Sequence, residues 1–537
     1  MDTRSLLTVL LATLCVLQMT AAPGHAQNEG GTAPGAPADQ PFDFDDVKAL
    51  AKERAAKPYH APDLGLHPAL AALDWGQHSK IAFKRERGVW GDRPTPFRAF
   101  YHLRSGLHRH AINLYEVIDG KAHAAPFDLG MFDWAGLLDH ATFGSENPRV
   151  AGFRLLFPMH EPGRWAECVS VLGGTYFRAV GQHQTYGTSA RGVAIDAGFD
   201  HQEEFPDFTD FWLVAPPPPE APGGDTVTVW ALMDGPSLTG AFRFVLKPGE
   251  VTTIDTDAHF FLRRPVRKLG IAPLTSMFVY GEGSSFGRGE DYRPEVHDAD
   301  GLIIHNGPAP GAPDGEWLWR PLTNQHFLRV NRFILDNPKG FGLLQRDRDF
   351  EHYQDLDRAY QQRSSVWIET RGDWGRGTLE LIEWPSRTED YDNIGVFWLP
   401  HNAEDQPATG DPGQVSLPAG AELHYVYCVH WMGAQPLHPM AAVTGTRSAS
   451  IPGGRQFMVD FAGPPLEPRG TWDEVHVVAT AERGQVTKAW VRRNPFNGSW
   501  RATIDVAPEG REAVELRAYL TYEGKPISEV WSFAWNP

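Results

Sequence analysis

The chain is long, acidic and rich in aromatic residues. It has 537 residues and a net charge of −18, from 49 Lys and Arg against 67 Asp and Glu. This charge disfavours nucleic acid and anionic membrane surfaces as partners and is compatible with a neutral ligand. The length exceeds one ordinary hydrophobic core, so we expect two or more domains. The 18 tryptophans suit both a β-sandwich core and a sugar-binding cleft, and composition alone favours the core.

The first residues have the pattern of a secretory signal peptide. Arg4 precedes an apolar run over residues 6–19, and Gly24-His25-Ala26 offers a cleavage point, so residues 1–26 are predicted to be removed. The run is too short for a comfortable membrane span, and no later stretch approaches about 18 uninterrupted apolar residues. We therefore expect an exported protein without membrane insertion. Residues 27–41, rich in Gly, Pro and Ala, are predicted to be a disordered leader.

Two of the three cysteines, Cys168 and Cys428, lie outside the predicted signal peptide. Each lies in an apolar stretch that suits a buried thiol, and a single bridge between them is the alternative. Two cysteines in so long a chain do not make a disulfide scaffold.

One helix and many strands are predicted after the leader. Residues 42–59 have apolar residues at helical spacing, Asp43 or Asp45 as the N-cap, and Pro58 at the end. From about residue 80 onward, short alternating or apolar runs such as "VAGFRLLF", "FTDFWLVA" and "ELHYVYCVHW" are separated by turn residues, which is typical of strands. The predicted fold class is therefore all-β, with residues 42–430 forming a large sandwich. The stretch just after Trp431 reads as a loop, and six short strands within 440–537 predict an immunoglobulin-like sandwich.

Two acidic clusters stand out from ordinary surface charge. The first is His297-Asp298-Ala299-Asp300, and the second contains Glu389, Asp390 and Asp392. Each precedes an apolar strand, and in a strand Asp298 and Asp300 would share one face. Paired carboxylates beside aromatic residues suit glycosidic bond cleavage, which needs one acid and one base. Asx-turns at strand ends are the plainer reading. A metal site with His297, Asp298 and Asp300 lacks a fourth ligand at motif spacing, so no metal or cofactor is predicted.

Aromatic residues and arginines gather between these clusters and in an earlier segment. They are candidate sugar contacts, because arginines and carboxylates hold hydroxyl groups and aromatic rings hold sugar faces. A salt-bridged loop packed on a sandwich is the alternative. The predicted substrate-binding residues are Tyr176, Arg178, His183, Tyr186, Trp317, Trp319, Arg346, Arg348, Tyr353, Tyr360, Trp374, Glu389 and Asp390.

The phrases "YFRAVGQHQTYGTSARGVAID", "YRPEVHDADGL", "NPKGFGLLQRDRDFEHYQDLD" and "TEDYDNIGVFW" resemble the periplasmic glucan biosynthesis protein family, proteins G and D, over essentially the whole mature chain. The resemblance implies a galactose-mutarotase-like β-supersandwich followed by an immunoglobulin-like sandwich. It also implies a periplasmic location and action on β-1,2-linked glucan backbones. Some members are understood to be anomer-inverting endo-β-1,2-glucanases, and glycosyl transfer is the related reaction. Carried onto matching positions, Asp392 is the general acid and Asp300 the base, with Asp298 beside it.

The sequence is also compatible with another function and with further partners. A non-catalytic glucan-binding protein that assists backbone modification or release would use the same aromatic cleft without turnover. A homodimer and contact with glucan-modifying membrane proteins are further partner hypotheses. The loop "NGPAPGAPDGEW" is longer than the family pattern, and we expect such an insert beside the cleft to alter product length or to favour transfer.

Overall fold

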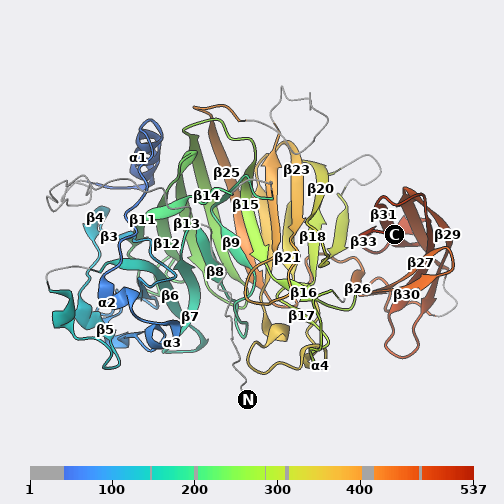
Figure 1. The fold of residues 1–537 in the computed structure, drawn as a ribbon, viewed down its shortest axis with the longest axis horizontal. Coiled ribbons are helices and arrows are strands. Elements are labelled where there is room, and N and C mark those ends of the chain that lie inside the picture. Colours follow the sequence, from blue (N-terminus) through green and yellow to red (C-terminus); the bar gives the residue numbers. More distant parts are fainter. Residues whose placement is uncertain are drawn as a thin grey trace, which may run out of the picture. The chain divides into compact units, whose positions relative to one another are not determined.

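The computed structural model describes residues 41–144, 148–198, 203–284, 286–308, 314–401, 417–470 and 474–537. The predicted signal peptide, the predicted leader up to residue 40, and residues 309–313 of the long loop lie outside these ranges. The described residues are mostly β-strands (Figure 1). The prediction of an all-β protein is therefore confirmed. No helix in the described ranges is long and apolar enough to cross a membrane.

The first main sheet has 15 strands and continues into the C-terminal part of the chain. Its central strands pair antiparallel, and β19 pairs parallel with β33. In order across the sheet, the strands are β28 (Val475–Glu482), β31 (Val514–Tyr522), β33 (Val530–Trp535), β19 (Trp317–Pro321), β18 (Gly301–His305), β21 (Gly340–Leu344), β22 (Ser365–Arg371), β25 (Glu422–Met432), β14 (Thr252–Leu262), β13 (Leu238–Lys247), β12 (Val227–Asp234), β11 (Asp207–Val214), β3 (Asn113–Ile118) and β4 (Lys121–Ala124), with β32 (Lys525–Pro526) on β31.

The second main sheet has ten strands. Its order is β2 (Arg98–Leu103), β6 (Val150–Glu161), β7 (Arg164–Leu172), β8 (Tyr176–Ala179), β9 (Ser189–Arg191), β15 (Leu269–Ser276), β24 (Ile394–Pro400), β23 (Arg376–Glu383) and β20 (Arg329–Asp336), with β10 (Val193–Ile195) paired to β15. Two further pairs are β1 (Ala82–Phe83) with β5 (Phe132–Asp133) and β16 (Phe278–Tyr280) with β17 (Val296–His297).

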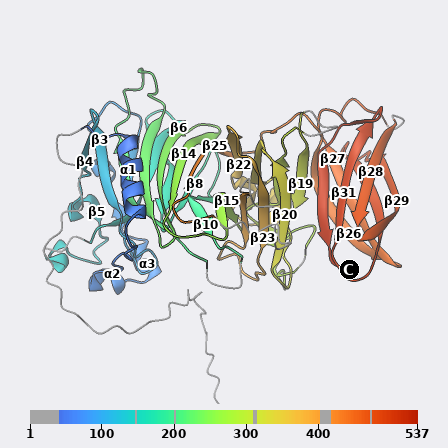
Figure 2. The same cartoon turned by 90° about the horizontal axis from the view of Figure 1, so that it is seen from above.

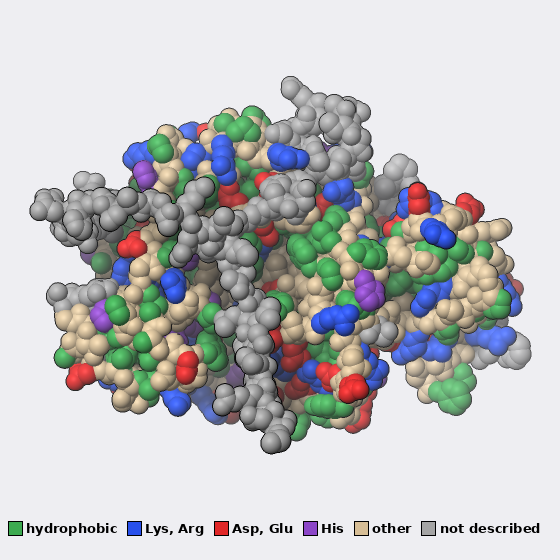
Figure 3. Space-filling view, viewed as in Figure 1, with side chains coloured by type: hydrophobic (Ala, Val, Ile, Leu, Met, Phe, Trp, Pro, Cys, Tyr) green, Lys and Arg blue, Asp and Glu red, His purple; other side chains and the backbone are tan. Residues whose placement is uncertain are grey.

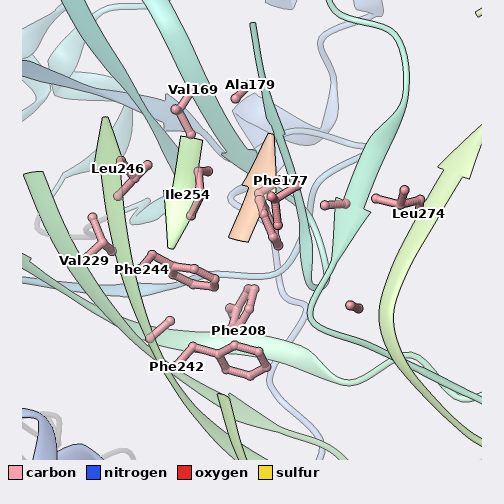
Figure 4. Packing of buried hydrophobic residues seen from close by; sticks show 14 of the residues in the cluster. Val169, Phe177, Ala179, Phe208, Val229, Phe242, Phe244, Leu246, Ile254 and Leu274 are labelled. Atoms are coloured by element: carbon pink, nitrogen blue, oxygen red, sulfur yellow. The ribbon is translucent and has the colours of Figure 1, made fainter. Parts of the chain in front are cut away.

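The main hydrophobic core contains side chains from both large sheets. Phe177 of the ten-stranded sheet lies 5.3 Å from Phe244 of the other sheet, measured between ring centroids. Phe208 contacts Phe242 edge-on at 5.2 Å, and these rings face the same interior (Figure 4). This packing buries the inward residue of each alternating pair, which is the pattern that the sequence showed.

The predicted helix near the N-terminus is α1 (Phe44–Ala55). Asp43 is its N-cap and accepts bonds from the backbone N–H groups of Asp45 and Asp46, so the prediction of a cap at Asp43 or Asp45 is confirmed at Asp43. Val47 and Ala51 are buried, and the helix packs on strands β12 to β14 (Figure 2). The other helices are short: α2 (Pro68–Ala71), α3 (Trp75–His78), α4 (Phe350–Tyr353), and the 3₁₀ turns η1 (Arg85–Arg87), η2 (Leu129–Met131), η3 (His140–Phe143) and η4 (Tyr360–Gln362).

The C-terminal strands lie in two sheets, and the core between them also contains Ile303, Trp319 and Trp367 of earlier strands. A four-stranded sheet contains β26 (Ala442–Ile451), β27 (Gly454–Ala462), β30 (Trp500–Pro508) and β29 (Gly484–Arg493). Strands β28, β31 and β33 lie opposite, and Phe457, Leu516 and Trp531 pack between the sheets. The loop predicted after Trp431, over residues 433–454, is wrong for residues 442–451, which form β26. The described residues form one compact unit, so a domain boundary between residues 430 and 440 stays a prediction.

Cys168 and Cys428 are free thiols, and both are buried. Of the two alternatives that the sequence left open, the structure shows buried thiols and no bridge between them.

Candidate functional site

Asp392 lies in the turn that precedes β24, with its side chain 26% exposed. The hydroxyl group of Thr275 donates to Asp392 Oδ2 at 2.9 Å, and the guanidinium of Arg178 lies 3.9 Å from the same oxygen. The carboxylate is therefore held on one side and open to solvent on the other.

The side chain of Asn393 fixes the turn that presents Asp392. Its amide oxygen accepts from the N–H of Phe278 at 2.8 Å, and its amide nitrogen donates to the carbonyl groups of Phe278 and Trp384 at 2.9 and 3.0 Å. Because Asn393 is buried, these bonds have little competition from water. In the sequence Asp392-Asn393, an exposed carboxylate is thus followed by a buried amide whose hydrogen bonds fix the turn.

Asp298 lies beside this group, in the connection between β17 and β18. Its backbone N–H donates to the carbonyl of Met277 at 2.8 Å, and its carboxylate lies 3.1 Å from Nε of Arg363. Burial raises the pKa of Asp298 to about 6, an effect that Arg363 opposes and the negative charge of Asp392 increases. The negative charge of Asp392 and the positive charges of Arg363 and Arg178 therefore act on Asp298.

Asp300 has different partners. Its Oδ2 accepts from the backbone N–H groups of Arg346 and Asp347 at 3.0 and 2.9 Å, while Oδ1 is buried without a hydrogen bond. Burial raises the pKa of Asp300, against the positive charge of His297. The expectation that Asp298 and Asp300 share a strand face is wrong, because residues 298–300 connect β17 to β18 and are not part of either strand.

Asp300 lines a small cavity of about 50 Å³. The other polar side chains around this cavity are Glu282, Glu295, His297, Arg346, Asp347, Thr444 and Thr446. Burial raises the pKa of Glu282 to about 7, and the Thr446 N–H, which donates to this carboxylate, opposes the rise. Burial lowers the pKa of His297, but its bonds to Glu295 and Gln345 and the negative charges of Glu295 and Asp300 together outweigh burial and leave the pKa above its ordinary value. The cavity thus gathers the carboxyl groups of Glu282, Glu295, Asp300 and Asp347 around His297 and Arg346.

Glu389, three residues before Asp392, belongs to a network of arginines. The hydroxyl group of Tyr360 donates to Glu389 Oε2 at 2.8 Å, and Arg293 lies 2.8 Å from the same oxygen. Arg293 also pairs with Asp291 and Asp355, each at 2.7 Å. Acidic and basic side chains are mixed on the surface around α4, next to this network (Figure 3).

Two further residues of the same turn face solvent. Asp390 is exposed and accepts a bond from the Thr388 hydroxyl at 2.6 Å. Tyr391, which precedes Asp392, is 49% exposed, so its ring could meet a sugar face.

Several predicted sugar contacts are buried in the structure. Trp374 is 3% exposed in the main core, and Tyr353 is fully buried. Trp319 is 4% exposed, and the Arg346 guanidinium lies 3.7 Å from its ring while also pairing with buried Glu529. Tyr360 is also buried. Trp317 and Arg348 are half-buried and make structural contacts: Trp317 stacks on His305, and Arg348 donates to the carbonyl groups of Gln361 and Arg363. These contacts match the packing alternative for this region.

The predicted sugar contacts within residues 176–186 have different surroundings in the structure. Arg178 is exposed and reaches Asp392, whereas Tyr186 donates to Glu167 at 3.0 Å. Tyr176 lies under the guanidinium of Arg191, and His183 stacks on His160. Arg178 is therefore the member of this group that lies beside Asp392.

Three residues of the site were not predicted from the sequence. Thr275, Arg363 and Asn393 hold the two aspartates, and none of them belongs to a recognisable catalytic pattern. Arg363 and Thr275 reach the site only through the fold, while Asn393 could have been found as the neighbour of Asp392.

The chain matches a known family over most of its length. The family model "Periplasmic glucan biosynthesis protein, MdoG" matches residues 42–535. The chain is 39% identical to "Glucans biosynthesis protein D 1" of Ralstonia nicotianae, over 100% of this chain and 99% of the relative. It is 38% identical to "Glucans biosynthesis protein G" of Pseudomonas paraeruginosa, over 98% and 96%. A solved galactose mutarotase related enzyme from Lactobacillus acidophilus covers 54% of this chain and 97% of its own, at 10% identity and a TM-score of 0.22.

Proposed function

Because the chain belongs to the periplasmic glucan biosynthesis protein family MdoG, we propose that it acts in the periplasm on β-1,2-linked glucan backbones. In this proposal it cleaves the backbone as an anomer-inverting endo-β-1,2-glucanase or transfers the cleaved chain as a related transglycosylase. The relatives' names concern glucan biosynthesis, so they support a glucan as the substrate class but name neither the linkage nor the reaction. The finer assignment depends on the carboxylates described above.

Cleavage of a glycosidic bond needs an acid for the leaving oxygen and a base for the incoming nucleophile. We assign the acid to Asp392, because its side chain is the more exposed of the two and can meet the glycosidic oxygen. We assign the base to Asp298, reached through an intervening water. With a pKa of about 6, Asp298 is ionised at neutral pH and still accepts a proton readily. The observation that carries the proposal is geometric: Asp298 bonds through its N–H to Met277, and Asp392 is held by Thr275 and by the bonds of Asn393 to Phe278, so one short segment positions both carboxylates.

Asp300 is the base that the family resemblance implies, and it is the rival of Asp298 for that role. One of its oxygens is held by two backbone N–H groups, and the charges that act most on it are those of His297 and Arg346. For Asp298, in contrast, the negative charge of Asp392 is among the causes that raise the pKa. The surroundings therefore favour Asp298 as the base. Comparison of Asp298→Asn with Asp300→Asn distinguishes the two assignments.

Substrate contacts in this proposal come from the exposed rim. Arg178 offers guanidinium donors to sugar hydroxyl groups, and Tyr391 offers a ring face. Glu389 and Asp390 are acceptors on the same turn. Tyr360 acts through Glu389, to which it donates its hydroxyl hydrogen.

A non-catalytic glucan-binding protein is the second candidate. The observation that favours it is that both aspartates have an arginine neighbour, at 3.1 and 3.9 Å, as purely structural carboxylates commonly do. Such a protein would hold the glucan in the same place without turnover.

The test is incubation of linear β-1,2-glucan with the wild-type chain and with Asp392→Asn, Asp298→Asn and Asp300→Asn, followed by mass and anomeric analysis of the products. We expect loss of products with the first two variants and retained cleavage with Asp300→Asn. Asp336→Asn, at an exposed position at the end of β20, is the matched control and should cleave as the wild type does.

Three outcomes would change the assignment. Loss of products with Asp300→Asn but not with Asp298→Asn would move the base to Asp300. Unchanged cleavage with both Asp392→Asn and Asp298→Asn would remove the proposed pair. Binding of the glucan by calorimetry without any product from the wild-type chain would favour the non-catalytic candidate.

A further inference from the structure

A thiol, an imidazole and a carboxylate meet on the outward face of the 15-stranded sheet. Cys428 and His430 are two residues apart on β25, so their side chains lie on one face of the strand. Glu369 on β22 is directly opposite Cys428 in the strand pairing. One ligand atom from each of the three lies within 4.8 Å of the others, and His430 Nε2 is 3.0 Å from Glu369 Oε2.

This group lies away from the hydrophobic core and is accessible from solvent. The alternate residues of β25, Tyr427, Val429 and Trp431, point into the main core, so Cys428 and His430 point the other way. The side chain of Glu369 is 47% exposed and that of His430 is 24% exposed, whereas Cys428 is 2% exposed. The Cys428 thiol is therefore the buried donor of this group, and the imidazole of His430 and the carboxylate of Glu369 reach the surface.

The charges around the thiol are mostly negative. Asp255 of β14 lies opposite Cys428 on the side away from Glu369, because both strands pair with β25 at this residue. Arg371 pairs with Asp255 at 2.6 Å. Two carboxylates thus flank one buried thiol, and this surrounding favours a bound cation.

We propose that Glu369, Cys428 and His430 form a zinc-binding site, with the fourth coordination position open to solvent beside Asp255. Sulfur, imidazole nitrogen and carboxylate oxygen are the donors that Zn²⁺ takes in proteins, commonly with water as the fourth ligand. A soft thiolate excludes Mg²⁺ and Ca²⁺ as the preferred ions, since both favour oxygen donors. The proposal is independent of the glucan activity, because the site shares no residue with it.

A neighbouring trio provides an internal comparison. Asp257, His259 and His424 also lie close together, but the two imidazole rings are stacked at 4.1 Å and nearly parallel, at 10°. An imidazole binds a metal in the plane of its ring, and two stacked parallel rings cannot both hold one ion in their planes. Both rings instead bond to Asp257 Oδ1, at 3.0 and 2.9 Å. This trio is therefore a hydrogen-bonded group and a suitable control.

The first experiment titrates the purified wild-type chain with Co²⁺, which replaces Zn²⁺ and gives an absorption band when a thiolate binds it. We expect the band at one equivalent of Co²⁺, its loss on addition of Zn²⁺, and its absence from Cys428→Ala. Cys168→Ala is the matched control, because Cys168 is buried in the main core, where its thiol donates to the Leu155 carbonyl. This variant should keep the band.

The second experiment measures Zn²⁺ affinity by competition with a chelator. Glu369→Gln and His430→Gln should each weaken binding by about tenfold or more. His424→Gln should bind Zn²⁺ as the wild type does. If circular dichroism shows that Cys428→Ala is misfolded, these variants decide the question alone.

Absence of the band from the wild-type chain would overturn the proposal, and so would its persistence in a folded Cys428→Ala. Equal Zn²⁺ affinity in the wild type and in Glu369→Gln and His430→Gln would do the same. Glucan cleavage by the metal-free chain is measured alongside, so that failure of one proposal is not mistaken for failure of the other.

Discussion

The Asp298 carboxylate lies 3.1 Å from Nε of Arg363, and this guanidinium opposes the rise in the pKa of Asp298 that burial causes. Arg363 follows η4, whereas Asp298 follows β17, so the contact joins two connections that are distant in the chain. The pair therefore sets both the position of Asp298 and the pH at which it becomes charged.

Removal of this cation should shift the ionisation of Asp298. In Arg363→Gln the carboxylate loses a nearby positive charge, so its pKa should rise above about 6. Because the proposed base works in its ionised form, the acidic limb of the pH profile for glucan cleavage should move to higher pH. The profile and a carbon NMR titration of Asp298 measure the shift. Arg363→Lys keeps the charge and should shift it less; equal profiles for wild type and Arg363→Gln would show that Asp298 is not the titrating group.

Buried Glu529 should make stability depend on pH. Burial raises its pKa, but Arg346 and His438 outweigh burial and lower it from 4.5 to about 2. A lowered carboxyl pKa contributes stability above the unfolded value of 4.5, and this contribution is lost as the pH falls toward 2. The difference corresponds to about 3 kcal/mol. Urea denaturation at several pH values should show this loss in the wild type.

The variant Glu529→Gln tests the same group at neutral pH. It leaves Arg346 without its buried partner, and we expect a loss of about 3–5 kcal/mol in the free energy of unfolding at pH 7. Between pH 5 and pH 2 the variant should lose less stability than the wild type does. Glu161→Gln is the control, because this pair with Arg164 is exposed and should contribute less than about 1 kcal/mol. Parallel pH curves for wild type and Glu529→Gln would refute the assignment.

Strand and helix positions followed from local sequence, because burial alternates with the period of each element. The run of β14 alternates buried and half-buried residues, and Asp43 caps α1 as a helix start requires. β26 was missed because its residues 442–451 contain Gly, Ser and Thr and bury few side chains. The sequence could not show that its pairing with β27 completes the strand.

The site was predicted less well, for physical reasons. The two-residue repeat of a strand predicted that Asp298 and Asp300 lie on one face. In the structure the backbone N–H of Asp298 bonds to Met277 and that of Asp300 to Leu344, and the two carboxylates have different partners. The same aromatic residue types occur in hydrophobic cores and in sugar-binding clefts, so the sequence could not show that Trp374 is buried in the core. Glu369 and Cys428 meet only through the pairing of β22 with β25.

Gly301, directly after Asp300, should tolerate no side chain. A Cβ atom there would lie 2.1 Å from Trp319 Cζ2, and Trp319 is buried beneath Arg346. Gly301→Ala must therefore displace the indole, at a cost of about 1–3 kcal/mol in the free energy of unfolding. Gly106→Ala is the control, since no atom lies within 4 Å of its added Cβ. Equal denaturation midpoints for the two variants would contradict the close contact.

Asn393 should control the rate of cleavage through the position of Asp392. Asn393→Ala removes three hydrogen bonds from the turn before β24 but leaves the carboxylate in place. A displacement of about 1 Å can reduce a rate about 100-fold, so kcat should fall by one to two orders of magnitude, roughly, with KM much less affected. Asn393→Asp turns a buried carboxylate oxygen toward the carbonyl groups of Phe278 and Trp384, so its kcat should fall at least as far as that of the Ala variant. Steady-state kinetics on linear β-1,2-glucan measure both constants. A folded Asn393→Ala chain that cleaves at the wild-type rate would show that Asp392 does not depend on this clamp.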